Sequence, residues 1–444
     1  MPGRSRLELR WGRIDLHRPA KPEVKITLRI CLVGATNPCH NPRLVREADT
    51  LVHAGHQVRV VAHGAQSMLS KFDERLLCRR NWRLERIDLH SDVSMKRPHS
   101  LWMRARRRLA SSAFDRLKWT KLAEYSSCTS LPELTKLAAA EPADWIIAHT
   151  QPVLPAAAAA AKYWKTRLGF DCEDLLSETG EDSCEAIRVI EHRYLPECQY
   201  VSVTSSSMAE YMVRTYGIAR PTVLYNVFPL SLAKCLMRPL AKPPHLPLRL
   251  HWVSQTVGID RGLHDILEAC ASLGEKVELH LRGQVSEERK SVILNFAERC
   301  GVTKSIKFHP LIEHDELVKS MGQYDVGLAL ERPNRGNQSI TVSNKLFSYM
   351  LAGLAIAATD TPGQREILDQ VPTVGFLYPA GNSTVLAQKL GNLINNPSLL
   401  LAAKQAAWDA ARSKFCWDLE ETKFLQLLGG LPNAVGEIAK ATPR

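Results

Sequence analysis

The sequence contains no uninterrupted apolar run near the roughly 20 residues that a membrane-spanning helix requires. Residues 1–27 are basic and have no apolar core, so we expect a flexible tail there rather than a secretory signal. The 11 cysteines stand singly, without a C-x-x-C pair. That spacing gives no disulfide framework and no zinc motif, and it is typical of reduced, buried thiols in a cytoplasmic protein.

The chain is instead rich in apolar and basic residues. Its 444 residues are 45% hydrophobic, which is enough for an extensive core divided between two or three domains. Lysine and arginine number 58 against 46 acidic residues, for a net charge of +12. Such a charge suits phosphorylated ligands, an anionic membrane surface or nucleic acid. No recognised nucleic-acid module is visible, so we do not expect a nucleic-acid partner.

A strand, a polar loop, a helix and a second strand follow one another from Leu28. The apolar run 28–33 ends at Gly34, a helix is expected over 43–53, and the next strand over 58–62. This order predicts the βαβ opening of a doubly wound parallel sheet, without the G-x-G-x-x-G fingerprint of dinucleotide binding. Ligands bind such sheets beyond the carboxyl ends of the strands. The loop places four polar residues beyond the first strand, although a polar turn and a helix start would explain them equally well: Asn37, His40, Asn41 and Arg43.

A later strand, expected over 144–148, ends at His149. An alanine-rich helix over 155–165 and a short strand over 168–170 then lead into the acidic turn 171–174. Carboxylates continue from Glu173 to Glu185. Metal binding by this cluster is conceivable, but such spacing is more typical of a solvated acidic loop, so we predict no metal site.

Proline and lysine residues over 239–247 indicate a linker between two domains. We divide the chain into a tail (1–27), a first domain (28–238), this linker, a second domain (248–398), a C-terminal helix (399–431) and a second tail (432–444). In the second domain, the loop 254–262 follows a strand and carries Arg261 at the start of a helix. A guanidinium at a helix start is suited to a phosphate group. The loop 331–345 brings further donors to another helix start, among them Arg335, Asn344 and Lys345.

The stretch 339–368 has the clearest local pattern of the chain. Helical spacing of apolar residues predicts a helix over 343–352 that ends at Gly353. A small apolar run, 354–358, is typical of a strand buried on both faces. The residues after it, from Thr359 to Leu368, are expected to form a loop at the carboxyl end of that strand.

The amino-acid sequence of this stretch resembles that of the retaining GT-B glycosyltransferases of the group 1, glycogen-synthase-like type. Their second domain reads K-L-x-E-Y-M-A-x-G, then P-V-V-A-T-D and G-G-x-x-E. The matching residues here are Lys345, Leu346, Tyr349, Met350, Gly353, Thr359, Asp360, Gly363 and Glu366. Two acidic residues that the family carries with seven residues between them fall at Ile340 and Ser348, and neither is acidic.

The resemblance implies two facing doubly wound, Rossmann-like α/β domains with an interdomain cleft, braced by the C-terminal helix. It also implies transfer of a sugar from a nucleotide-sugar donor to an acceptor, with retention and without a cofactor. The usual context is bacterial polysaccharide or lipid-linked glycan synthesis. The implied catalytic residues are His149, Glu173 (or Asp171, if the register slips by two) and Glu366, with Glu366 orienting the donor sugar. The resemblance also implies that the first loop, with Asn37, His40 and Asn41, faces the cleft. The candidate donor-binding residues are Gln255, Arg261, Arg282, Arg335, Asn344, Lys345, Ser348 and Gly363.

Two alternatives stay open at this point. The first is a sugar-nucleotide epimerase, which would be expected to place several carboxylates around the donor sugar. The second is a catalytically impaired member that keeps the fold as a binding or scaffold protein. Replacement of expected residues by Gln255, Glu173, Ile340 and Ser348 would suit that second case.

The segment from Lys96 to Lys118 is basic and amphipathic and is interleaved with aromatic residues. Such a segment suits an anionic membrane surface, with a solvated basic helix as the alternative. The charges expected to hold it there are Arg104, Arg106, Arg107 and Arg108. We therefore expect a cytoplasmic protein, with peripheral attachment to the inner face of a membrane through this segment.

Overall fold

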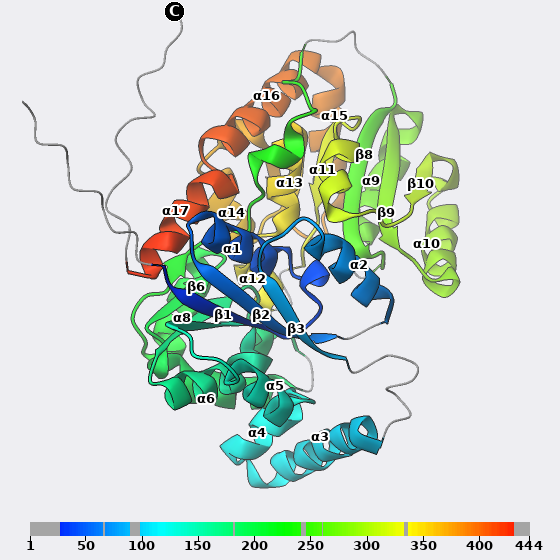
Figure 1. Cartoon of the computed structure of the whole chain (residues 1–444). Helices are drawn as coiled ribbons and strands as arrows, with labels where there is room; N and C mark the ends of the chain where they lie inside the picture. Colours follow the sequence, from blue (N-terminus) through cyan, green and yellow to red (C-terminus); the bar gives the residue numbers. More distant parts are fainter. Residues whose placement is uncertain are drawn as a thin grey trace, which may run out of the picture.

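The computed structural model describes residues 27–64, 67–88, 98–180, 183–240, 246–259, 261–332 and 336–429. Both tails, most of the linker and Arg335 lie outside these ranges. In the described part, the strands form two wholly parallel sheets with helices on both faces, one sheet in each half of the chain (Figure 1). The predicted α/β fold of two Rossmann-like domains is confirmed.

The first sheet has the strand order β3-β2-β1-β4-β5-β6-β7. Its strands are β1 (Arg29–Gly34), β2 (Gln57–Gly64), β3 (Arg83–Asp88), β4 (Trp145–His149), β5 (Arg167–Cys172), β6 (Tyr200–Val203) and β7 (Thr222–Val223). Its helices are α1 (Pro42–His53), α2 (Ser67–Leu77), α3 (Pro98–Leu117), α4 (Thr120–Ser127), α5 (Leu131–Ala138), α6 (Leu154–Trp164), α7 (Cys184–Tyr194) and α8 (Ser206–Tyr216). The order reverses between β1 and β4, so the carboxyl ends of these two strands form the switch point where such sheets bind ligands.

The second sheet repeats this topology in the order β10-β9-β8-β11-β12-β13. Its strands are β8 (Leu248–Thr256), β9 (Val277–Gln284), β10 (Ile306–His309), β11 (Val326–Ala329), β12 (Ala355–Thr359) and β13 (Gly375–Tyr378). The helices around it are α9 (Leu263–Leu273), α10 (Glu287–Arg299), α11 (His314–Met321), α12 (Gly336–Ile340), α13 (Asn344–Ala352), α14 (Pro362–Leu368), α15 (Ser383–Asn395) and α16 (Pro397–Ser413). Its switch point lies between β8 and β11.

Loops at the carboxyl ends of the two sheets meet each other. After β5, the backbone N–H of Leu175 donates to Asn337 of α12, which follows β11, at 2.7 Å. After β6, the hydroxyl of Ser205 donates to the carbonyl of Ile340 at 2.5 Å. Because the ligand-binding ends of both sheets share this junction, residues from both domains can act on one bound molecule.

The chain crosses to the second domain earlier than the sequence indicates. The 3-10 turn Leu230–Ala233 packs on α11 and α13, and Leu236 lies against Gly322 of the second domain. Apolar burial fixes this segment on the second domain, so the crossing precedes residue 239. Near the C-terminus, α17 (Trp417–Leu427) lies against α1 of the first domain, where the Trp417 indole donates to Thr50 at 2.8 Å (Figure 1).

Two further expectations about local structure need correction. The expected loop after β12 contains the helix α14, whose first turn is set by Thr361 as N-cap and Pro362 at the first helical position. The C-terminal region is two helices, α16 and α17, rather than one.

Candidate active site

A buried network of charges lies at the switch point of the first sheet. The guanidinium of Arg43, on α1, contacts Asp171 of β5 at 2.7 Å and Glu47, one turn along α1, at 3.4 Å. His149, at the end of β4, contacts Glu47 at 3.3 Å and Asp171 at 3.5 Å. All four side chains have no exposed surface. Buried charges are tolerated only when they compensate one another, and here two cationic groups face two carboxylates.

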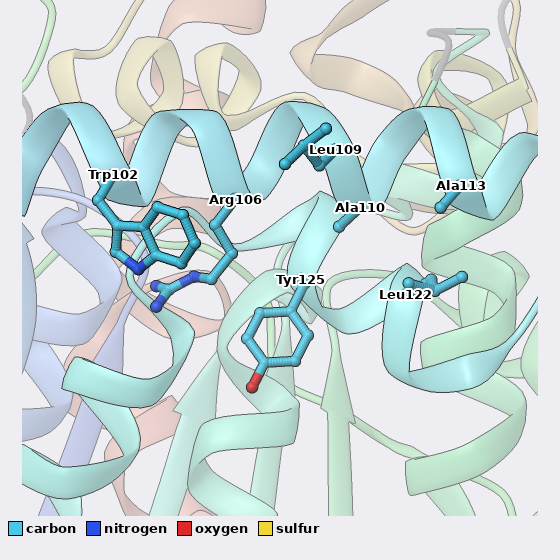
Figure 2. Close-up of a pocket in the computed structure, with 7 residues that line it drawn as sticks. All are labelled: Trp102, Arg106, Leu109, Ala110, Ala113, Leu122 and Tyr125. Atoms are coloured by element: carbon cyan, nitrogen blue, oxygen red, sulfur yellow. The ribbon is translucent and has the colours of Figure 1, made fainter.

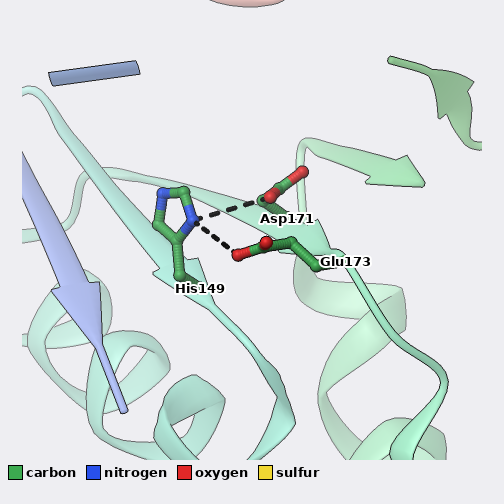
Figure 3. Close-up of side chains that lie close together, drawn as sticks. All are labelled: His149, Asp171 and Glu173. Atoms are coloured by element: carbon green, nitrogen blue, oxygen red, sulfur yellow. Dashed lines mark ion pairs between the residues drawn. The ribbon is translucent and has the colours of Figure 1, made fainter. Parts of the chain in front are cut away.

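Glu173 extends this network toward the junction between the domains. Its carboxylate lies 3.9 Å from the imidazole of His149, so the structure brings these two predicted catalytic residues together (Figure 3). Burial disfavours the charged imidazole, but the carboxylates of Glu47, Glu173 and Asp171 outweigh it and raise the pKa of His149 to about 10. Conversely, burial opposes the charged form of Glu173, but His149 and Arg43 lower the pKa of that carboxyl. The imidazole is therefore a cation at neutral pH.

The raised pKa of His149 predicts how the stability of the fold depends on pH. Because the folded-state pKa of about 10 lies above the ordinary value of 6.5, its charge stabilises the fold fully below pH 6.5 and progressively less toward pH 10. The free energy of unfolding should fall more between about pH 7 and 10 for the wild type than for His149→Gln. Urea unfolding midpoints at several pH values would measure this. Parallel curves for the two proteins would contradict a charged His149.

The residue after His149 has a strained backbone. Thr150 has φ 73°, a left-handed conformation that a β-branched residue adopts rarely. Such strain costs about 1–3 kcal/mol and is concentrated at functional sites. The sequence offered no signal for it, because threonine is ordinary in any loop.

The candidate residues of the first loop separate into two groups. Asn37 is buried and donates to Asp73 of α2 at 2.7 Å, so it joins the loop to that helix. His40 is exposed. Asn41 caps α1 through the N–H of Leu44 and also hydrogen-bonds Glu173, which lowers the pKa of that carboxyl. Only Asn41 and Arg43 of the four therefore belong to the charge network.

His149, Asp171 and Glu173 place one ligand atom each within 4.8 Å of one another, a spacing that a metal ion could use. A metal ligand must be a neutral imidazole, however, and the neighbouring carboxylates keep His149 protonated. The guanidinium of Arg43 at 2.7 Å from Asp171 adds a second positive charge beside the group. We therefore describe the cluster as an ion-pair network.

The second domain contributes a cationic cluster around Glu331, which follows β11. Lys345, in the first turn of α13, donates to the Glu331 carboxylate, and Ser343 donates to the same oxygen at 2.8 Å. Burial raises the pKa of Glu331, but Lys345 and, to a smaller extent, Arg261 lower it, and the net result is a lowered pKa. The N-cap residue Ser343 makes no side-chain hydrogen bond to the backbone N–H groups at the start of α13. A cationic cluster at a helix N-terminus is suited to a diphosphate.

The two clusters meet across the junction. Asn337 of α12 donates to the carboxylate of Asp174 at 2.9 Å, and Asp174 adjoins Glu173 in the chain. Burial raises the pKa of Asp174, and the carboxylates of Glu173 and Glu331 add to the rise. Glu331 of the second domain is thus within electrostatic range of the first-domain network. Asn337 and Glu331 both lie in the loop 331–345 that the sequence indicated for a diphosphate, but neither was among the predicted donor-binding residues.

Other predicted donor-binding residues lie at varied positions. Gln255 and Asn344 are exposed, beside Ser254 and Lys345 respectively. The hydroxyl of Ser348 is buried and donates to the carbonyl of Lys345 within its own helix, so it does not replace the missing acid. Gly363 allows close packing, since a Cβ there would lie 2.1 Å from the carbonyl oxygen of Thr341. Arg335 lies outside the described residues.

Arg282 does not join the cationic cluster around Glu331. It is buried on β9, opposite His309 of β10, and it donates to the carbonyl of Pro310 at 3.0 Å. Its guanidinium lowers the pKa of His251, which burial already lowers, to about 3. The described contacts of Arg282 therefore lie with neighbours in its own sheet.

Glu366 has a different environment from the one predicted. Its carboxylate accepts hydrogen bonds from the backbone N–H of Ser206 at 2.9 and 3.1 Å, from the Ser206 hydroxyl at 2.9 Å and from Tyr225 at 2.8 Å. All three donors belong to the first domain. Glu366 thus caps the N-terminus of α8 from the other domain, and its oxygens face that helix rather than His149.

This arrangement predicts a structural effect of Glu366→Gln. An amide offers one acceptor where the carboxylate has two, and it brings an N–H₂ group against the N–H of Ser206. Hydrogen bonds to charged groups contribute about 1.5–3 kcal/mol, so we expect the free energy of unfolding to fall by about that amount. Nucleoside diphosphate binding should stay near that of the wild type. Unchanged stability together with lost turnover would instead identify Glu366 as a residue that orients the sugar.

Comparison with known proteins agrees with this geometry. The profile of the family "Glycosyl transferase 4-like domain" matches residues 40–227, and that of "Glycosyl transferases group 1" matches residues 249–396. Between them they cover both domains and both clusters. A search of curated protein sequences found no match.

Solved structures show the same fold at low sequence identity. Anabaena HepE in complex with UDP is 17% identical, with a TM-score of 0.66 over 91% of this chain and 100% of that chain. Sucrose-phosphate synthase from Thermosynechococcus elongatus is 13% identical, with a TM-score of 0.64 over 90% and 98%. A putative UDP-N-acetylglucosamine 2-epimerase from Listeria monocytogenes is 11% identical, with a TM-score of 0.56 over 90% and 95%.

The fold alone does not separate transferases from epimerases, because both occur among these structures. The group 1 profile does separate the two classes, since it is a glycosyltransferase profile and it matches the domain that carries Lys345, Glu331 and α13. Together with the first-domain profile, it shows that this chain belongs to the group 1 glycosyltransferases and has the GT-B fold.

Proposed function

We propose that this glycosyltransferase moves a hexosyl group from a nucleoside-diphosphate sugar to a glycan or lipid-linked acceptor, with retention at the anomeric carbon. UDP-sugars are the first donors to test, because HepE is described in complexes with UDP and with UDP-glucose. The bacterial pathways of polysaccharide or lipid-linked glycan synthesis, on the cytoplasmic side of the membrane, are the proposed context. No cofactor takes part in the proposed reaction.

The observation that carries this proposal is the convergence of Arg261 and Lys345 on Glu331 at the start of α13. As the bond from the sugar to the diphosphate breaks, negative charge develops on the leaving phosphate. Fixed cations and helix N–H groups stabilise that charge without reorganising, which is usually the largest single contribution to catalysis. A bound diphosphate would take over the hydrogen bond that Lys345 now donates to Glu331.

The first-domain network is proposed to meet the sugar from the other side. Asn337 and Asp174 hold the two domains together there. Glu173, next to Asp174 in the chain, contacts His149 at the end of the neighbouring strand β4. The positive charge of His149 fixes the Glu173 carboxylate in its ionised form. An ionised carboxylate near the sugar would stabilise the positive charge that develops at the anomeric carbon.

A thermal-shift screen across nucleoside diphosphates tests the donor class. A ligand at about 100 times its dissociation constant adds roughly 2.7 kcal/mol to the stability of the folded state. We expect one of UDP, GDP or ADP to raise the melting temperature clearly above the others. The matching nucleotide sugar should then release that diphosphate only when an acceptor is added. Conversion of the sugar without an acceptor would identify an epimerase or hydrolase instead.

A further inference from the structure

The helix pair α3 and α4 gathers exposed apolar side chains at one end of the first domain. Five large hydrophobic residues between positions 101 and 119 are about half exposed or more, namely Leu101, Trp102, Leu109, Leu117 and Trp119, at 54%, 58%, 66%, 49% and 63%. Scattered exposed hydrophobic residues need no explanation, but such a concentration marks an interaction surface. Figure 1 shows the pair at the end of the molecule away from the second sheet.

The exposed residues of α3 form a coherent surface. Met103, Ala110 and Phe114 face the protein interior, whereas Trp102 and Leu109, two turns apart, stand on one side of the helix. They line an open groove of about 380 Å³ together with Leu122 and Tyr125 of α4 (Figure 2). The rest of the lining is Arg106, Ala110 and Ala113. Among these lining residues, only Arg106 carries a charge, on its guanidinium.

That guanidinium belongs to the structure of the pair. Arg106 contacts Glu133 at 2.9 Å, donates to the carbonyl of Thr129 at 3.1 Å and lies 5.5 Å over the ring of Tyr125. The expectation that Arg106 serves as a surface charge is thus wrong, because its charge is compensated by Glu133 within the fold. Lys96 and Arg97, from the same predicted segment, lie outside the described residues.

The other arginines give the surface a strong positive charge. Helix α3 holds five arginines and one aspartate, and Arg107, Arg108 and Arg116 are exposed. The Arg107 guanidinium donates to the carbonyl of Ser126 at 3.1 Å, which positions the side chain but does not cancel its charge. Cations next to exposed tryptophan and leucine complement the phosphates and acyl chains of an anionic bilayer. Nucleic acid would satisfy the arginines but would leave the leucines in water.

We propose that α3 and α4 dock onto the surface of an anionic lipid bilayer. The helices lie in the plane of the membrane, with Trp102 and Leu109 at the boundary between headgroups and acyl chains, and the groove takes the end of an acyl chain. Arg107, Arg108 and Arg116 contact lipid phosphates. The surface lies away from α13, so docking leaves the junction of the two sheets off the membrane (Figure 1). This proposal does not depend on the identity of the donor or acceptor.

The test is cosedimentation of the full chain with vesicles of phosphatidylcholine containing about one third phosphatidylglycerol, at low and high salt. We expect binding at low salt that falls steeply as salt screens the arginines, and none to pure phosphatidylcholine. The pairs Trp102→Ser with Leu109→Ser, and Arg108→Ser with Arg116→Ser, should each weaken binding by about tenfold or more. The matched controls on α10, Val292→Ser and Arg289→Ser, should bind as the wild type does, since both side chains are exposed far from α3.

Hydrogen exchange of the wild type keeps the test independent of how the variants fold. Amides of α3 and α4 should become protected when the anionic vesicles are added, and those of α10 should not. Absence of binding at low salt, or unchanged exchange in α3, would overturn the proposal. The proposal would also be overturned if either double variant of α3 sedimented differently from the wild type in the absence of vesicles. Such a difference would identify an interface between two copies of the chain. Displacement from vesicles by a short nucleic-acid duplex at equal phosphate concentration would favour a nucleic-acid surface instead.

Discussion

Replacement of Arg261 by alanine is expected to weaken binding of the nucleoside diphosphate by about tenfold or more, because a charge-assisted hydrogen bond to phosphate contributes roughly 1.5–3 kcal/mol. Arg261 is exposed, and its described hydrogen bond, to the hydroxyl of Ser254 at 2.9 Å, is with a near neighbour in the chain. The melting temperature of the free protein should therefore stay nearly unchanged. Isothermal titration with the diphosphate identified in the thermal-shift screen would measure the loss.

Lys345→Ala should weaken the same binding but behave differently in the free protein. Lys345 is only 17% exposed and neutralises Glu331, so its removal leaves that carboxylate without its main counter-charge. We expect a lower melting temperature in addition to weaker binding. Arg289→Ala, on the exposed face of α10, is the matched control for loss of a positive charge. Equal affinity in Arg261→Ala and wild type would remove Arg261 from the diphosphate site.

Arg43→Met is expected to cause the largest loss of stability of any substitution considered. The side chain has no exposed surface, and it neutralises both Asp171 and Glu47. Its removal takes away the cation in contact with both buried carboxylates and leaves His149 and the nearby Arg46 to oppose them. Breaking a buried ion pair in this way costs about 3–5 kcal/mol. Its N–H donation to the carbonyl of Leu224, at 2.6 Å, is lost as well. The midpoint of urea unfolding should fall accordingly.

A double variant separates charge from packing in this result. Arg43→Met combined with Asp171→Asn removes one of the unpaired carboxylates, so it should recover part of the lost stability. Arg220→Ala is the control, because its ion pair with Glu210 at 3.5 Å is more than half exposed on both sides and should contribute little. Wild-type stability in Arg43→Met would show that the network does not hold the first sheet together.

Local structure followed from the sequence wherever apolar spacing and glycine act together. The expected helix over 343–352 and strand over 354–358 lie within one residue of α13 and β12, and Gly353 ends the helix at φ 72°. The helix α14 was missed although Thr361 and Pro362 form a typical helix start. The edge strand β3 was not predicted, because its sequence, RLERID, does not alternate apolar and polar residues.

The sequence by itself determined the two parallel sheets, the family resemblance and the strand-end positions of His149, Glu173 and Glu331. Only the tertiary structure decided which of these side chains meet. Arg43 and Asp171 are separated by 128 positions, and Glu366 and Ser206 by 160, and such pairs leave no periodic trace in the chain. They form because the carboxyl ends of two sheets pack together, which requires each buried charge to find a counter-charge in a distant segment. For the same reason Glu366 meets α8 in this structure rather than the place that the motif predicted.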